Sequence, residues 1–335
     1  MATVQDVADE AGVSAMTVSR FFNHPHQLSP DTKERVREAV EALQYVPNQT
    51  ARSLTSGETK TVALILADIT NPFFTQVARG AEDAAQAAGY ALILSNTDET
   101  PSKEQRYINV LVSRQIDGVL LAPHDGGDRV QTLRQHDVPV VLIDRRVPGA
   151  DVDTLTTDSA DGSRQLVTHL REQGYRRIGF VGGHPDISSL EERLAGYRDA
   201  MQAAGLTPDV HLGAYSVESG ETITEELIAS DALPDAIIAA NNLVAVGCVS
   251  TLRRHDRHVP DDVALACFGD LELTARIDPF LTVIAQPAYE LGRRAMEQLI
   301  ERMEGSTDPA GDTVLPVELI ARRSTAPHPR SAEVQ

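Results

Sequence analysis

Apolar positions at the start of the chain recur at helical spacing. They stand at i, i+3, i+4 and i+7 from Val4 to Ala11, which places them on one face of a short helix. Thr3, with Asp6 three residues later, is typical of a capping box at the beginning of such a helix. Gly12 then interrupts the pattern. The sequence therefore predicts a first helix that ends in a tight turn.

A second and a third helix follow directly. Ser14 is a helix cap before a helical pattern over 15–22, and Ser29 followed by Pro30 predicts the start of a third helix that runs to about residue 43. Two short helices joined by a turn with glycine are typical of a helix-turn-helix, whose second helix enters the major groove of DNA. A small three-helix domain without a role in nucleic-acid binding is the alternative.

The outer face of the second predicted helix is small and polar. Ser14, Thr17 and Ser19 are short enough to hydrogen-bond to phosphates, and Arg20 can donate two hydrogen bonds to the edge of a guanine. Residues 1–57 carry five basic and seven acidic side chains, so the segment as a whole is not basic. DNA binding therefore requires the basic side chains to cluster on one side, which the position of most acidic side chains on the first and third helices allows.

From about residue 61 the pattern changes to short apolar runs that alternate with helical stretches. The runs are VALIL (62–66), YALILS (90–95), GVLLAP (118–123), VPVVLID (138–144), RIGFVGG (177–183), DAIIAA (235–240) and VALACF (263–268). This alternation predicts parallel strands covered by helices. Because it occurs in two sets, before and after Thr157, we expect two α/β lobes with a cleft between the carboxyl ends of their strands.

No motif for catalysis or cofactor binding stands out. The pair Gly182-Gly183 lacks the spacing of a dinucleotide fingerprint, and neither a phosphate loop nor an HExxH motif occurs. Of the ten histidines, His255 and His258 come closest to metal-ligand spacing, and solvation at the surface is the expectation for both. We predict that the protein is not an enzyme and uses neither a cofactor nor a metal ion.

Length and composition narrow the class of protein. A chain of 335 residues suggests two or three domains, and its formal net charge of −19 argues against non-specific binding of polyanions by most of the surface. Cys248 and Cys267 stand in apolar runs and are expected to be small buried side chains. No stretch resembles a signal peptide or a membrane span, so we expect a soluble cytoplasmic protein without membrane contact.

Two runs near the N-terminus, TVQDVADEAGVSAMTVSRFFN (3–23) and VREAVEALQYVPNQTARSL (36–54), resemble the head of the LacI/GalR family of transcriptional repressors. The resemblance implies that Ala15, Met16 and Arg20 face the bases of an operator. It also implies a hinge helix that orders on DNA, with Leu54 wedged into a base step from the minor groove. Such a short segment is not a stable helix alone, and an inert linker is the alternative.

The candidate DNA-contacting residues follow from these runs. They are Thr3, Ser14, Ala15, Met16, Thr17, Ser19, Arg20, Asn23, Asn48, Ala51 and Leu54. The expected partner is double-stranded operator DNA.

The chain from Thr61 to about Thr325 resembles the effector domain of the same family, which is similar in fold to periplasmic sugar-binding proteins. The matching motifs are DITNPFF (68–74), IDR (143–145), EERLAGY (191–197) and LTVIAQP (281–287). The resemblance implies a small-molecule effector at Asn71, Phe73, Phe74, His124, Asp144, Arg145, Arg193, Asn241, Asp270 and Gln286. Their polar groups suit hydroxyls, and the two phenylalanines offer flat apolar faces, with a role in the core as the alternative.

The patterns and the resemblance together divide the chain. We expect an all-α helix-turn-helix domain at 1–46, a hinge helix and linker at 47–58, a two-lobed effector and dimerisation domain at 59–326 and a disordered tail at 327–335. The effector domain is expected to be an α/β fold of doubly wound parallel sheets, like a periplasmic binding protein. Its first lobe is expected at about 59–158 and 288–312, and its second at about 159–286 and 313–326.

Two positions depart from the family pattern. Asn242 stands where the family commonly has the aspartate of an A-N-D motif, and Gly269 stands where it has the aspartate of a G-F-D motif, which often binds sugar hydroxyls. A pocket that loses a carboxylate while it keeps Arg145 and Arg193 becomes more positive. We therefore hypothesise an anionic effector, such as a sugar acid like gluconate, and a resemblance to gluconate-type regulators agrees, with a ribose-type subgroup as the alternative.

The run STAPHPRSAEVQ (324–335) has no apolar heptads, so we expect a homodimer rather than a tetramer held by a coiled coil. A dimer suits a pseudo-palindromic operator with two half-sites. The sequence thus predicts a regulator, most often a repressor in this family, whose DNA affinity a carbohydrate or sugar-acid effector controls. A soluble sugar-binding module and a cytosolic sugar-metabolising enzyme are the alternatives.

Overall fold

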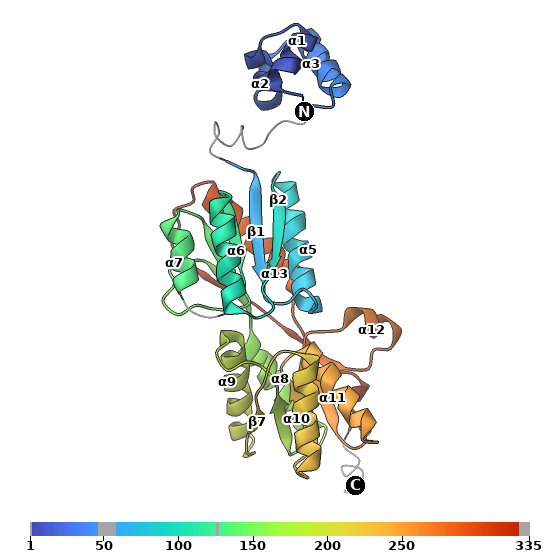
Figure 1. Ribbon diagram of the computed structural model, residues 1–335. Coiled ribbons are helices and arrows are strands. Elements are labelled where there is room, and N and C mark those ends of the chain that lie inside the picture. The colour runs from blue at the N-terminus through green and yellow to red at the C-terminus, as the bar shows by residue number, and fades with distance from the viewer. Residues whose placement is uncertain (1, 46–57, 125–126, 328–335) are drawn as a thin grey trace. The chain divides into compact units, whose positions relative to one another are not determined.

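The computed structural model describes residues 2–45, 58–124 and 127–327, which fall into two compact units divided after Thr59. The first unit holds helices α1 (Val4–Ala11), α2 (Ala15–Asn23) and α3 (Pro30–Ala42), with a short 3₁₀ helix at Pro25–Gln27 (Figure 1). The three predicted helices are present with nearly the expected bounds. The predicted hinge residues, Asn48, Ala51 and Leu54, and the predicted tail from residue 328 lie outside the described residues.

A small apolar core joins the three helices of the first unit. Val7, Val18 and Val36, one from each helix, are fully buried in it. Val4, which the sequence pattern placed on the buried face, is 38% exposed. It begins α1 and therefore lies at the edge of this core, one turn before Val7.

Two six-stranded sheets form the second unit. The first has the order β11-β5-β4-β3-β1-β2, with β1 (Thr61–Leu66), β2 (Ala91–Asn96), β3 (Gly118–Leu121), β4 (Val140–Ile143), β5 (Thr154–Thr157) and β11 (Asp312–Leu315). The second has the order β12-β10-β9-β8-β6-β7, with β6 (Ile178–Val181), β7 (Asp209–His211), β8 (Ala236–Ala239), β9 (Ala264–Phe268), β10 (Thr282–Ala285) and β12 (Glu318–Ile320). Strand pairs are parallel, except that β12 runs antiparallel to β10.

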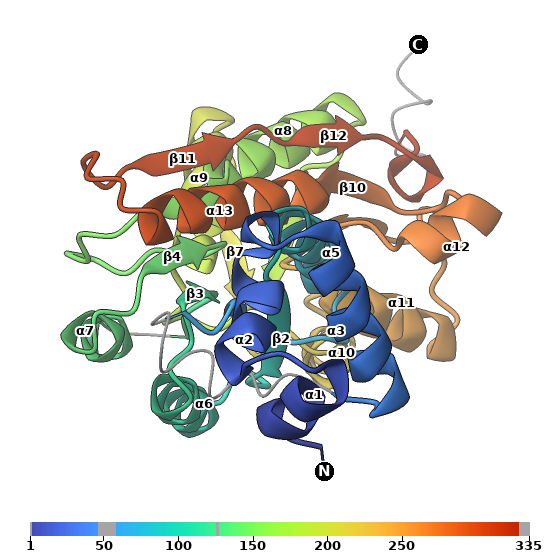
Figure 2. The same ribbon diagram turned by 90° about the horizontal axis from the view of Figure 1, so that it is seen from above.

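Helices cover both faces of each sheet and complete two lobes. In the first lobe these are α5 (Pro72–Ala87) and α13 (Ala288–Met303) on one face, and α6 (Pro101–Ser113) and α7 (Asp128–Gln135) on the other. In the second lobe, one face is covered by α8 (Ser159–Glu172) and α9 (Ser188–Ala203), and the other by α10 (Val217–Ala229) and α11 (Asn242–Arg254). The short helix α12 (Glu272–Ile277) follows β9. Figure 2 shows α5 and α13 side by side, where an added Cβ at Gly80 or Gly292 would collide with the backbone of the other helix.

The predicted fold class, a helix-turn-helix domain followed by two parallel α/β lobes, is the one observed. The expected lobe boundary differs at one place, because β11 pairs with β5 in the first sheet. The chain therefore returns to the second lobe after Leu315, later than the predicted residue 312. Three of the four residues of β11 are exposed, so its sequence carries little of the apolar signal of a buried strand.

Cys248 and Cys267 are fully buried with free thiols, as their apolar surroundings predict. Burial raises the pKa of the Cys248 thiol to about 11 and that of Cys267 even further. Both side chains therefore act as small apolar groups of the core at neutral pH. No helix in the described part of the chain combines the length and the apolar character that a membrane span requires.

Candidate functional site

A tight turn sets the angle between α1 and α2. Gly12 ends α1 in the left-handed conformation, with φ of +62°, and its carbonyl oxygen and that of Ala11 accept hydrogen bonds of 2.9 and 2.5 Å from Arg35 of α3. Ser14 then begins α2 by accepting a hydrogen bond of 3.2 Å from the backbone N–H of Thr17. Contacts at both ends of the turn thus fix α2 on the other two helices.

The outer face of α2 has no acidic side chain. Met16 is 65% exposed, Ser19 and Arg20 are exposed, and Ala15 and Thr17 are half-buried. The Arg20 guanidinium lies 3.7 Å from the sulfur of Met16, so the two long side chains form one patch. A helix with one arginine and small neighbours can enter the major groove without a charge that repels phosphate.

Of the other predicted DNA-contacting residues, Thr3 caps a helix, and the remaining ones have side chains or positions that the structure does not describe. The Thr3 hydroxyl and Asp6 form the predicted capping box of α1, with hydrogen bonds of 2.7 to 3.2 Å. Asn23 ends α2, but its side chain is not among the described ones. Asn48, Ala51 and Leu54 lie outside the described residues altogether.

A cavity at the carboxyl ends of the strands lies between the two lobes of the second unit. It is lined by Asp68, Asn71, Phe73, Phe74, Glu99, Asp144, Arg145, Ser189, Arg193, Tyr215, Asn241, Asn242, Phe268, Gly269 and Gln286. Its free volume is about 40 Å³, which is room for only a few water molecules. A ligand the size of a monosaccharide therefore needs the lobes to separate or the lining side chains to move.

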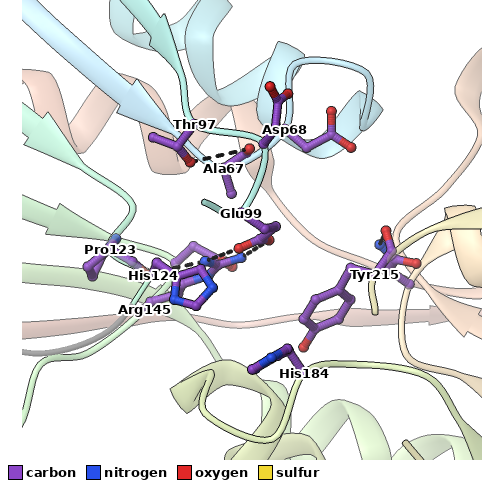
Figure 3. Close-up of polar contacts among 12 residues, drawn as sticks. Ala67, Asp68, Thr97, Glu99, Pro123, His124, Arg145, His184 and Tyr215 are labelled. Carbon is purple, nitrogen blue, oxygen red and sulfur yellow. Dashed lines mark hydrogen bonds and ion pairs between the residues drawn. The ribbon is translucent and has the colours of Figure 1, made fainter. Parts of the chain in front are cut away.

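Eight of the ten predicted effector residues line this cavity, and His124 and Asp270 do not. The Asp270 carboxylate is bound by the Arg322 guanidinium in two hydrogen bonds of 2.5 and 2.8 Å, which turn it away from the cavity. The His124 ring lies 5.6 Å from that of His184 in the opposite lobe (Figure 3). The cavity lining thus gives these two assignments no support, and they stay predictions.

Arg145 is paired inside the first lobe. It is 3% exposed, and it donates hydrogen bonds of 2.5 and 2.8 Å to the two carboxylate oxygens of Glu99 and one of 3.2 Å to the Pro123 carbonyl (Figure 3). Burial opposes both charges, but the ion pair outweighs it: it lowers the pKa of Glu99 and raises the pKa of Arg145. Burial raises the pKa of the adjacent Asp144 carboxyl, although Arg145 opposes the shift.

Arg193 of α9 contrasts with Arg145. It is 5% exposed, its Nη1 donates a hydrogen bond of 2.8 Å to the carbonyl oxygen of Ala240, and its guanidinium lies 4.5 Å over the ring of Phe268. Within the described residues it makes no ion pair, and its Nε atom has no hydrogen-bond partner. A buried guanidinium without a carboxylate partner is costly unless a ligand satisfies it.

Further unpaired polar atoms meet Arg193 in the cavity. The hydroxyl of Tyr215 and the Oδ1 atom of Asn242 are buried without a hydrogen-bond partner among the described residues. The Nε atom of Arg145 also lacks a hydrogen bond there, but it forms an ion pair of 3.5 Å with Asp144. Figure 3 shows the Tyr215 hydroxyl directed into the space between the lobes. Because buried polar groups in folded proteins are nearly always hydrogen-bonded, this concentration indicates a site for a polar ligand.

Several predicted residues position the site through bonds of their own. The side chains of Asn71 and Asn241 cap α5 and α11, with hydrogen bonds of 3.0 and 2.9 Å from backbone N–H groups. Asn242 of the second lobe donates a hydrogen bond of 3.4 Å to Asn71 of the first. Gln286 donates one of 2.8 Å to Thr157, where the chain passes between the lobes. These groups shape the cavity and join its two walls.

The sequence analysis did not include five polar lining residues among the effector contacts: Asp68, Glu99, Ser189, Tyr215 and Asn242. Asp68, Glu99 and Tyr215 stand in the loops after β1, β2 and β7, and Ser189 is in the first turn of α9. The position of polar residues after strands was the signal for the other lining residues and could have found these too. No cluster of three or more metal-ligating side chains occurs in the described part of the chain.

Comparison with known proteins identifies the family. Residues 3–48 match the bacterial regulatory proteins of the lacI family, and residues 167–325 match the periplasmic binding protein-like domain. The chain is 32% identical over 331 residues to the HTH-type transcriptional repressor CytR of Escherichia coli strain K12, across 97% of this chain and 96% of that protein. The chain belongs to the LacI family of bacterial transcriptional regulators.

Other relatives agree with this assignment. The HTH-type transcriptional regulator RegA of Clostridium saccharobutylicum is 34% identical over 331 residues, which cover 97% of this chain and all of RegA. Because relatives that match almost the whole chain are transcriptional regulators, this LacI-family protein is a regulator and not an enzyme, as the sequence predicts.

Solved structures share the fold along nearly the whole chain. The complex of the transcriptional regulator CelR with cellobiose is 32% identical, with a TM-score of 0.73, and the match covers 97% of this chain and 100% of CelR. The Lac repressor dimer bound to operator and the anti-inducer ONPF is 24% identical, with a TM-score of 0.86 and coverage of 97% and 99%. A LacI-family regulator from Enterococcus faecium with bound ribose is 27% identical, with a TM-score of 0.73 over 80% of this chain and 99% of that one.

Proposed function

We propose that this LacI-family regulator is a repressor that binds a pseudo-palindromic operator as a homodimer, and that a small polar effector between its lobes controls its affinity for DNA. The effector is a carbohydrate or a sugar acid. The observation that carries this proposal is the interlobe cavity, where three buried polar atoms of the described residues lack a partner, in a chain that also holds a helix-turn-helix.

The contacts with DNA come from the exposed face of α2. Arg20 has the reach and the paired donors to bind a guanine in the major groove. Ala15 and Met16 are apolar, so they read thymine methyl groups or the shape of the groove rather than polar base edges. Ser14, Thr17 and Ser19 bind phosphates, and the segment that contains Asn48, Ala51 and Leu54 binds the minor groove.

The effector contacts come from the cavity. Its polar lining suits a ligand with many hydroxyls, and Phe73, Phe74 and Phe268 provide apolar faces for C–H groups. CelR with cellobiose and the Enterococcus faecium regulator with ribose have carbohydrates bound and share this fold. Both facts support a carbohydrate-like effector.

Two exposed apolar surfaces support a homodimer. Strand β2 is an edge of the first sheet, and its Ile93 and Leu94 are 39% and 41% exposed. In the second lobe, Val246 of α11 and Ile277 of α12 are 37% and 88% exposed. An exposed edge strand with apolar side chains promotes aggregation, so folded proteins normally cover it. A second copy of the chain would cover both surfaces and place two recognition helices on one operator.

The proposal is tested by fluorescence polarisation with labelled DNA from upstream of the protein's own gene. We expect tight binding to one fragment. The affinity should fall as the salt concentration rises, because phosphate contacts release counterions. One member of a panel of sugars and sugar acids should lower or raise the affinity. A scrambled fragment of the same composition is the control. Equal affinity for the fragment and the scrambled control would contradict the proposal.

A further inference from the structure

The charges around the interlobe cavity are divided between its walls. The first lobe supplies three carboxylates, from Asp68, Glu99 and Asp144, and one guanidinium, from Arg145, which Glu99 neutralises. Among the described lining residues of the second lobe, Arg193 carries a charge and all the others are neutral. The first-lobe wall therefore offers hydrogen-bond acceptors. The second-lobe wall carries the Arg193 guanidinium, which interacts electrostatically with the Asp144 carboxylate across the cavity but makes no ion pair among the described residues.

Both departures from the family pattern lie in the second wall. Asn242 and Gly269 line the cavity at the two positions where the sequence pattern of the family would place aspartate. The nearest carboxylate along the chain, that of Asp270, binds Arg322 instead. The wall that carries Arg193 therefore has no carboxylate of its own among the described lining residues.

The beginning of α9 adds partial positive charge to the same wall. Asn71 and Asn241 cap the neighbouring helices α5 and α11, but no side chain caps the N-terminus of α9. Ser189 stands in the first turn of α9, four residues before Arg193, so the two side chains share one helix face and both line the cavity. Free N–H groups at a helix N-terminus favour an anion.

The hydroxyl of Tyr215 completes this wall. It is buried, has no hydrogen-bond partner among the described residues, and comes from the loop between β7 and α10 of the same lobe. The ring of Phe268 under Arg193 holds the guanidinium plane while Ala240 binds only Nη1. The Nε side of Arg193 is left for a ligand.

From these contacts we infer that the effector is a polyhydroxylated acid, whose terminal carboxylate or phosphate group binds Arg193, Ser189 and the N-terminus of α9 while its hydroxyls donate to the carboxylates of the first lobe. This inference rests on the proposed function and names the chemistry of its effector. A ligand with an acid at one end and hydroxyls along its length matches both walls and joins them. A neutral sugar has no anionic group to accept from Arg193 Nε, Ser189 and the N-terminus of α9 together.

Isothermal titration of the full-length protein with matched ligands tests the inference. Each set holds an aldose, its aldonate and its terminal phosphate ester, for example D-glucose, D-gluconate and D-glucose 6-phosphate, with the equivalent sets for pentoses and other hexoses. We expect an acid to bind at least about tenfold more tightly than its neutral partner, since a charged hydrogen-bonded contact is typically worth 1.5 to 3 kcal/mol. Whether the aldonate or the phosphate ester binds more tightly identifies the acid group.

Variants of α9 then locate the acid group. Arg193→Gln should weaken the acid by about a hundredfold and its neutral partner by far less, Arg193→Lys should restore part of the difference, and Ser189→Ala should cost about threefold. Arg198→Gln, at an exposed position of the same helix, is the matched control and should leave the affinity unchanged. Circular dichroism melts show whether each variant is folded.

The outcomes separate this inference from the proposed function. The inference is overturned if a neutral aldose binds as tightly as its acid, if Arg193→Gln weakens both equally, or if no acid of the panel binds below about 1 mM, the weak limit of ordinary specific affinity. If a neutral sugar binds in the cavity and alters operator binding, the proposed function stands and only the acid is excluded. Loss of specific operator binding itself would instead overturn the proposed function.

Discussion

Arg20 carries the clearest prediction at the scale of single residues. It is exposed, contacts Met16, and is the one basic side chain in α2. Arg20→Ala should lower operator affinity by about 1 to 3 kcal/mol, roughly 5- to 150-fold, because a guanine loses two donors. Fluorescence polarisation measures the change.

The control for this prediction is Arg37→Ala, at an exposed position of α3 that pairs with Glu34. It removes the same charge from the same unit and should change operator affinity by less than about threefold, the size of a single peripheral charge effect. Equal losses in the two variants would mean that Arg20 acts only through the net charge.

The pair of Glu99 and Arg145 predicts how stability depends on pH. The ion pair holds the pKa of Glu99 below its ordinary value of 4.5, so the pair stabilises the fold above that pH, and the contribution is lost as pH falls through the lower, folded-state pKa. Glu99→Gln should lower the free energy of unfolding by about 3 kcal/mol at neutral pH, since it leaves a buried guanidinium partly unpaired.

Urea unfolding at neutral and acid pH measures this. The difference between wild type and Glu99→Gln should shrink as the pH falls below about 4.5, while Glu82→Gln, at an exposed position of α5, should change stability little at any pH. A difference that stays constant with pH would show that Glu99 acts through packing and not through its charge.

Helix α9 is the element that links the two lobes at the site. It carries Ser189 and Arg193 into the cavity, and Arg146 of the first lobe holds it: the backbone N–H of Arg146 donates to Ser188 at 2.8 Å and its Nε donates to Glu192 at 3.0 Å. Arg146→Gln should therefore favour separated lobes. We expect a larger radius of gyration in X-ray scattering and about fivefold weaker effector binding, corresponding to about 1 kcal/mol for a half-exposed pair.

Arg294→Gln is the matched control, because Arg294 pairs with Glu290 inside α13 and makes no ion pair across the lobes among the described residues. It should leave both the scattering curve and effector affinity unchanged. If Arg146→Gln behaves like Arg294→Gln, the contacts of Arg146 form when the lobes close but do not stabilise the closed arrangement.

Elements with strong periodicity could be predicted from the sequence, and elements fixed by tertiary contacts could not. Strand β1 is buried on both faces and therefore reads as a continuous apolar run. Strand β11 reads DTVL with three exposed residues, and its pairing with β5 gives it its place. In the site, the position after a strand indicated Arg145, but its partner Glu99 lies 46 residues away along the chain. The two meet because the loops after β2 and β4 lie at the same carboxyl edge of the first sheet, although β1 and β3 separate these strands.

At the scale of the whole molecule, the exposed apolar surfaces predict the oligomeric state. Ile277 is 88% exposed at the end of α12. Ile277→Asp should shift sedimentation from dimer towards monomer, because a buried carboxylate without a partner is costly in an interface. Operator affinity should fall by at least about tenfold, since one chain then contacts one half-site.

Val110→Asp, at an apolar position of α6 that is 43% exposed, is the control and should remain dimeric. A dimer of unchanged stability in Ile277→Asp would place the interface elsewhere on the second unit. Equal loss in both variants would indicate general destabilisation, which thermal unfolding detects.

The central claim is that one effector in the interlobe cavity and one operator oppose or assist each other through a shared coupling free energy. The measurement that tests it most directly is operator affinity by fluorescence polarisation, with and without saturating effector, for wild type and Arg193→Gln. We predict a change of at least about tenfold in wild type, within the usual range of such couplings, and almost none in the variant. An effector that binds the wild-type cavity while operator affinity stays the same would contradict the account.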